Sequence, residues 1–118
     1  MFSVVPHAVP VPEPPPIAPI IVKADTSTTK GIKQRIHYYA ELYGVSEITL
    51  LNVTHCESNF NPNAIGDGGR SFGLAQIHLP AHPQISKEEA LDPEFAIEFM
   101  AKNIKTGNGN MWTCWRMN

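Results

Sequence analysis

Prolines are concentrated near the start of this chain and limit what that part can fold into. Of the 11 prolines in 118 residues, seven lie between Pro6 and Pro19, where Glu13 is the only charged residue. Proline fixes φ and has no backbone N–H, so such a run favours extended polyproline geometry over a packed core. We therefore predict a proline-rich disordered tail or linker at residues 1–29 and one domain at residues 30–118.

Length, charge and hydropathy exclude several classes of protein. About 89 residues remain after the tail, enough for one small domain. Nine Lys and Arg against 11 Asp and Glu give a net charge of −2, so we expect no nucleic-acid partner. The longest apolar stretch, residues 17–22, falls far below the roughly 20 residues that cross a bilayer. We expect no transmembrane segment, and no secretory signal is visible, since the first basic residue is Lys23.

The rest of the chain has mostly helical patterning. Apolar residues at helical spacing predict helices over 31–43, 46–58 and from Pro93 to Gly107, the second of them running through the interior. Gly44 is expected to cap the end of the first helix and Ser46 the start of the second. Ser86 and Glu89 have the form of a capping box, and Asp92 followed by Pro93 predicts the cap of the last helix. Residues 59–73, rich in Asn, Gly and Pro, predict turns or a small hairpin, and residues 74–77 predict a short helical turn. The fold class is therefore mainly α, with a short hairpin region.

The two cysteines, Cys56 and Cys114, allow a single pairing. A bridge would close a loop worth about 4 kcal/mol in the chain-entropy model and would pin the C-terminal residues to the middle of the chain. We favour the bridge over two buried thiols because the domain is small, and a bridge implies an oxidising compartment.

Glu57 stands near the end of an apolar helix, with Val53 and Leu50 one and two turns before it on the same face. Burial disfavours the ionised carboxylate, and the partial negative charge of a helix C-terminus disfavours it further. Both effects predict a raised pKa for Glu57, and a carboxyl group protonated near neutral pH can act as a general acid. An arbitrary glutamate would more often be a solvated surface residue.

The strings HCESNFNPNA at residues 55–64 and SFGLAQI at residues 71–77 decide between these interpretations. Together with the later Asp-Pro helix, they make residues 31–106 resemble the soluble lytic transglycosylases. These are lysozyme-like enzymes that cleave cell-wall peptidoglycan. The resemblance implies an α+β lysozyme-like fold and a location outside the cytoplasm, and we expect a monomer.

The resemblance also implies roles for individual residues. Glu57 matches the single catalytic glutamate, and Ser58 matches a serine that hydrogen-bonds it. Gly73, Leu74 and Gln76 match the segment that lines the sugar groove, with Ala75 where the family usually has methionine. For the turn that contains Phe60, Asn61 and Ala64, the resemblance implies that it supports the end of the helix.

The implied reaction uses one carboxyl group twice. The acid protonates the oxygen that links N-acetylmuramic acid to N-acetylglucosamine, and the resulting carboxylate then removes a proton from the muramyl 6-hydroxyl. An anhydromuramyl sugar forms, so the reaction needs no second carboxylate, metal or cofactor.

The chain departs from the family after its last predicted helix. Many members carry an Ala-Tyr-Asn segment there that closes the groove, whereas this sequence reads MWTCWR at residues 111–116. Tyr39, Trp112 and Trp115 are candidates for stacking on sugars, and filling the small core is the alternative for each of them.

Two other functions stay open. Asp67 would be the second carboxylate of a hydrolysing muramidase, although an Asp between glycines more often serves turn geometry. Alternatively, the domain would bind glycan without cutting it.

Two histidine patterns carry less weight. His55 and Cys56 are helix neighbours that point to different faces, so they make no catalytic dyad. His78 and His82 have metal-like spacing, but Pro80 between them prevents the helix that would align them, which predicts loop residues.

Overall fold

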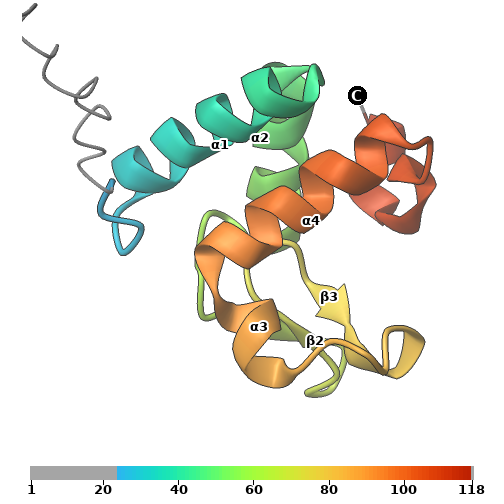
Figure 1. The fold of residues 1–118 in the computed structure, drawn as a ribbon. Helices are drawn as coiled ribbons and strands as arrows, with labels where there is room; N and C mark the ends of the chain where they lie inside the picture. The colour runs from blue at the N-terminus through green and yellow to red at the C-terminus, as the bar shows by residue number, and fades with distance from the viewer. Residues whose placement is uncertain (1–23, 118) are drawn as a thin grey trace, which may run out of the picture.

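The computed structural model describes residues 24–117, so the predicted tail lies outside the described residues except for its last few positions. Residues 24–28 form a turn that leads into the first helix. The described chain is mainly helical with one small sheet, and this confirms the predicted fold class (Figure 1). Among the described residues, no helix has the length and apolar character needed to span a membrane.

Local capping sets the bounds of the first two helices. α1 (Thr29–Tyr43) begins where the Thr28 side chain accepts a hydrogen bond from the Gly31 N–H, and ends at Gly44, whose φ of 67° is left-handed. α2 (Glu47–Ser58) begins at its N-cap Ser46 and ends at Asn59, which is also left-handed. The predicted helices and the Ser46 and Gly44 caps are confirmed.

The segment after α2 forms a three-stranded antiparallel sheet of very short strands, β1 (Ile65–Gly66), β2 (Ser71–Phe72) and β3 (Ile77–His78). Ile65 pairs with Phe72, and Phe72 with Ile77. The hairpin prediction is confirmed, but the helical turn predicted at residues 74–77 is wrong. Positive φ angles at Gly73 and Gln76 reverse the chain there, and Ile77 continues in β3.

Two helices follow a short 3-10 turn, η1 (Leu79–Ala81). The capping box of Ser86 and Glu89 is present at the start of α3 (Lys87–Leu91), as predicted. Asp92 caps α4 (Pro93–Lys105), which has proline in its first turn, also as predicted. The chain then continues through two 3-10 turns, η2 (Gly109–Met111) and η3 (Thr113–Met117).

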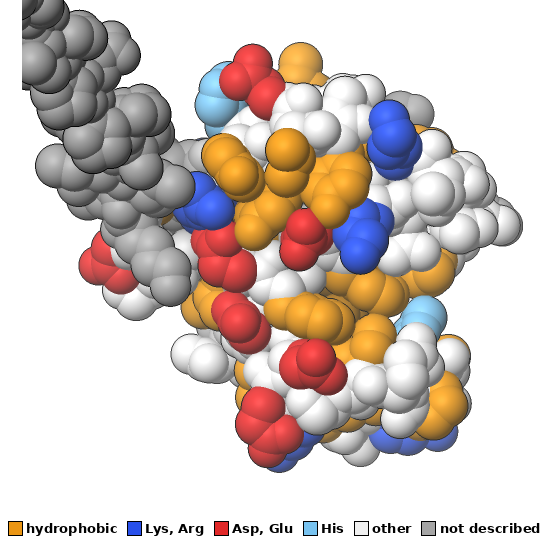
Figure 2. Space-filling view, viewed as in Figure 1, with side chains coloured by type: hydrophobic (Ala, Val, Ile, Leu, Met, Phe, Trp, Pro, Cys, Tyr) orange, Lys and Arg blue, Asp and Glu red, His pale blue; other side chains and the backbone are white. Residues whose placement is uncertain are grey.

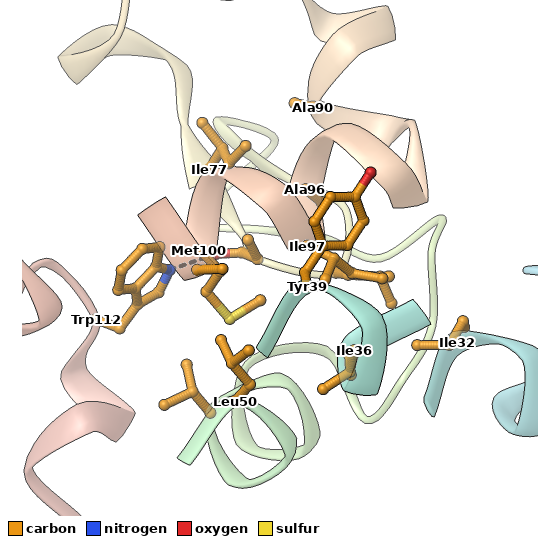
Figure 3. Packing of buried hydrophobic residues seen from close by; sticks show 14 of the residues in the cluster. Ile32, Ile36, Tyr39, Leu50, Ile77, Ala90, Ala96, Ile97, Met100 and Trp112 are labelled. Atoms are coloured by element: carbon orange, nitrogen blue, oxygen red, sulfur yellow. Dashed lines mark hydrogen bonds between the residues drawn. The ribbon is translucent and has the colours of Figure 1, made fainter. Parts of the chain in front are cut away.

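The core lies between α1, α2 and α4, which meet through fully buried side chains (Figure 3). Ile36 of α1, Leu50 of α2 and Met100 of α4 have no exposed surface. Burying each such side chain contributes about 1.5–3 kcal/mol. The prediction that α2 runs through the interior is wrong for one face, because Ile48 is 70% exposed and Cys56 is also exposed.

Candidate active site

A cleft of about 490 Å³ opens between the small sheet and the C-terminal turns, on one side of α4. In Figure 1 β3 and the C-terminal turns both lie toward the right of the view, below and above α4. The first wall, which we call the hairpin wall, is formed by Asp67, Arg70, Ser71, Gln76, Ile77, His78, Ala81 and His82. The second wall, the C-terminal wall, is formed by Met111, Trp112 and Thr113, and Glu57 and Phe99 complete the lining.

Glu57 occupies the cleft as the penultimate residue of α2. The side chain is half-buried, and this burial raises the pKa of its carboxyl group. The Cys114 backbone N–H, 3.5 Å from Glu57 Oε2, stabilises the carboxylate and partly opposes that rise, whereas the negative charge of Asp67 adds to it. The direction of the pKa shift agrees with the sequence prediction, so Glu57 is suited to donate a proton.

The contact between Cys114 and Glu57 depends on a disulfide. Cys56 and Cys114 are bonded, with their Cα atoms 6.0 Å apart, and this confirms the predicted bridge. Because Cys56 directly precedes Glu57, the bond holds the C-terminal wall beside the carboxylate. The indole Nε1–H of Trp112 donates to the Ala75 carbonyl oxygen at 2.8 Å and anchors the same wall a second time (Figure 3).

A polar network lies in the hairpin wall, facing the same cleft as Glu57. The Ser71 hydroxyl donates to Asp67 Oδ2 at 2.6 Å, and His78 Nδ1 lies 3.1 Å from that hydroxyl and 3.6 Å from Asp67 Oδ2. Asp67 has a φ of 52°, so it serves turn geometry and also lines the cleft. The loop prediction for His78 is wrong because the residue lies in β3; His82, which follows η1, also lines the cleft. No group of three or more metal-ligating side chains occurs within residues 24–117.

Of the three residues matched to the sugar groove, Gln76 alone lines the cleft. Its side-chain amide donates to the Ala64 and Gly73 carbonyl oxygens and ties the hairpin together. Leu74 is fully buried in the core. Gly73 packs against α3, where a Cβ atom would overlap the Ala90 carbonyl oxygen. The groove-lining prediction is therefore wrong for Leu74 and Gly73, whose roles are in packing.

Two other predicted site residues point elsewhere. The Ser58 hydroxyl donates to the Thr54 carbonyl oxygen at 3.0 Å, so its proton goes to the helix backbone instead of to Glu57. Tyr39 belongs to the core, and its hydroxyl donates to Glu94 Oε1 at 2.9 Å. Burial and this hydrogen bond raise the pKa of Tyr39 to about 12. Neither side chain lines the cleft.

The aromatic residues of the C-terminal turns divide between core and cleft. Trp112 is only 4% exposed and belongs to the core, yet it also lines the cleft. Trp115 is half-buried and packs against the core, close to Gly109. In the turn after α2, the Phe60 ring stacks on His55, in keeping with the structural role expected for this turn.

Some cleft residues had no signal of their own in the sequence. The Cys114 N–H and Thr113 join the site through the disulfide, and Phe99 joins it through tertiary packing. The bridge was the one available clue, because pairing Cys56 with Cys114 brings residues 111–113 next to Glu57.

A mainly helical domain with a half-buried glutamate at a helix end, facing a hairpin-walled cleft, has the architecture of a lysozyme-like glycosidase. The chain belongs to the transglycosylase SLT domain family, whose model matches residues 34–116. Membership indicates an enzyme of the transglycosylase kind that acts on peptidoglycan, outside the cytoplasm. No curated protein and no solved structure matched the chain.

Proposed function

We propose that this chain cleaves the β-1,4 bond between N-acetylmuramic acid and N-acetylglucosamine without water, leaving an anhydromuramyl end. The observation that carries the proposal is Glu57, a half-buried carboxyl group with a raised pKa inside a cleft large enough for a sugar. The family match supports the same reaction class.

In this mechanism Glu57 begins protonated and gives its proton to the glycosidic oxygen as the bond from that oxygen to the muramyl C1 breaks. The muramyl 6-hydroxyl then bonds to C1, and its proton returns to the Glu57 carboxylate. Between the two steps the Cys114 N–H stabilises the carboxylate. The acting groups are the Glu57 carboxyl group and the Cys114 backbone N–H, and the proposed reaction needs no metal or cofactor.

Glu57→Gln tests the proposal because it keeps the shape of the side chain and removes the transferable proton. We expect release of soluble fragments from purified cell wall to fall about 10²-fold to 10⁴-fold, while binding to the wall persists. Glu88→Gln, an exposed carboxylate on α3, is the matched control. Equal release by the Glu57→Gln variant and the unchanged protein would reject catalysis at this position. Wall binding with no release by either protein would favour a glycan-binding module.

Hydrolysis is the second candidate, supported by the position of Asp67 in the same cleft as Glu57. There Asp67 would activate a water that attacks C1. Mass spectrometry of the released fragments separates the two reactions, since the anhydro product is lighter by one water. A hydrated product that disappears in Asp67→Asn would establish the hydrolytic reaction.

The organisation around the domain belongs to the same proposal. Residues 1–29 would act as a tail or linker that joins the domain to the place where it works, outside the cytoplasm. We expect a monomer, and sedimentation of the full chain would test that expectation.

A further inference from the structure

Beside the cleft, α4 presents two aromatic rings that the proposed reaction does not use. Phe95 and Phe99 lie one turn apart with ring centroids 6.2 Å apart and planes 15° from parallel. Both side chains are half-buried, so each ring leaves part of its surface to solvent. With Glu98, Lys102 and Asn103 they line a second depression of about 230 Å³, which we call the α4 shelf.

The α4 shelf lies next to the cleft because Phe99 lines both. The Phe99 ring meets the Trp112 ring edge-on at 6.0 Å and the His82 ring edge-on at 5.3 Å. Phe95, Phe99 and Trp112 therefore make a row of aromatic rings that leads from the shelf to the cleft that holds Glu57. Figure 2 shows hydrophobic side chains across the middle of this face, with acidic, basic and histidine side chains around them.

The charges at the α4 shelf favour an anionic substituent near one end. The Glu98 carboxylate accepts a hydrogen bond from the Tyr43 hydroxyl at 2.6 Å, on the α1 side. Lys102 is exposed, and within the described part of the chain its ammonium group makes no ion pair. Its positive charge is therefore available to a ligand carboxylate.

We propose that the α4 shelf is a secondary subsite for an outlying sugar of the same glycan strand, with a carboxylate of the attached peptide near Lys102. The C–H faces of a pyranose ring are apolar and pack on aromatic rings. The position of the shelf next to the cleft favours the strand over an unrelated ligand, so this proposal rests on the proposed function. The subsite would increase affinity for long strands and leave short ones unaffected.

The test measures binding of glycan strands of defined length to the inactive Glu57→Gln protein by calorimetry. Phe95→Leu removes the ring but keeps apolar packing, and Phe95 does not line the cleft. We expect about fivefold to tenfold weaker binding of long strands and unchanged binding of a disaccharide-length ligand. Unchanged affinity for long strands, or an equal loss at both lengths, would overturn the subsite.

Lys102→Gln tests the charged end of the α4 shelf. We expect weaker binding of peptide-bearing long strands and no change for strands stripped of peptide, with Lys30→Gln on α1 as the matched control. Equal effects of Lys102→Gln on both kinds of strand would overturn the assigned carboxylate contact. Failure of the Glu57→Gln protein to bind any strand would overturn the proposed function as well. If that protein binds strands but Phe95→Leu does not weaken long strands selectively, only the subsite is overturned.

Discussion

The two walls of the cleft are held in place by different means. The hairpin wall is built from residues close together in sequence, joined by antiparallel backbone pairing and by the side chains of Asp67, Ser71 and Gln76. The C-terminal wall is held by a disulfide across 58 residues and by the hydrogen bond from Trp112 to the Ala75 carbonyl oxygen.

The two walls therefore depend on different kinds of interaction for their stability. Local pairing forms with little loss of chain entropy, whereas long-range tethers must overcome the entropy of closing a long loop. A covalent bond serves the second task because it restricts the unfolded chain. We therefore expect the C-terminal wall to fail first when a tether is removed, and the hairpin wall to tolerate single polar changes.

Removing the disulfide gives the largest expected effect. The double variant Cys56→Ser and Cys114→Ser loses about 4 kcal/mol of unfolding free energy, which corresponds to a melting temperature lower by about 15 °C or more. Activity should fall as well, because the Cys114 N–H no longer stays near Glu57. Thermal denaturation and fragment release measure the two effects.

A reductant supplies the control for this variant. Reduction of the unchanged protein should reproduce the loss of stability, and the serine variant should not respond to reductant. Unchanged melting temperature and activity after complete reduction would contradict the dependence of the C-terminal wall on the bond.

Gly73→Ala probes how the hairpin wall is anchored and has the second largest expected effect. The new Cβ would overlap the Ala90 carbonyl oxygen, and the φ of 80° disfavours alanine. We expect a loss of about 3 kcal/mol or more in denaturant unfolding. Gly69→Ala is the matched control, because its φ is 89° with nothing within 4 Å of the new Cβ. Its loss should be about 1 kcal/mol, and equal losses would show that contact with α3 does not anchor the hairpin.

Asp67→Asn gives the smallest expected effect, which is a shift in the pH dependence of activity. The negative charge of Asp67 raises the pKa of Glu57, so its removal lowers that pKa. Since Glu57 must be protonated to act as the acid, the alkaline fall in activity should move to lower pH, with the acidic plateau retained. Glu88→Gln should leave the profile in place. Collapse of activity at every pH in Asp67→Asn would instead support the hydrolytic mechanism.

Stability should depend on pH in the matching direction. The pKa of Glu57 is raised in the folded protein. Ionisation of Glu57 therefore lowers the stability of the folded state as the pH rises above the pKa that Glu57 has in the unfolded chain. Glu57→Gln removes this cost and should be more stable than the unchanged protein at neutral pH, where the two melting temperatures can be compared.

Particular residues show how far the sequence predicts the site. Ser46, Gly44, Ser86 and Asp92 predicted helix ends correctly, because caps act on backbone groups within a few residues. Residues 74–77 were predicted wrongly, since their apolar content fits either a helical turn or a buried hairpin turn, and only pairing of β2 with β3 decides.

The sequence by itself determined the helix bounds and the position of Glu57 at the end of an apolar helix, because these depend on local chemistry. It also allowed a single cysteine pairing, because the chain has only two cysteines. The tertiary structure decided which side chains face the cleft. Tyr39 and Leu74 were drawn into the core, while His78 and Phe99 were brought to the cleft. The physical reason is that burial depends on contacts between segments far apart in the chain, and local pattern does not specify which face of each segment those contacts cover.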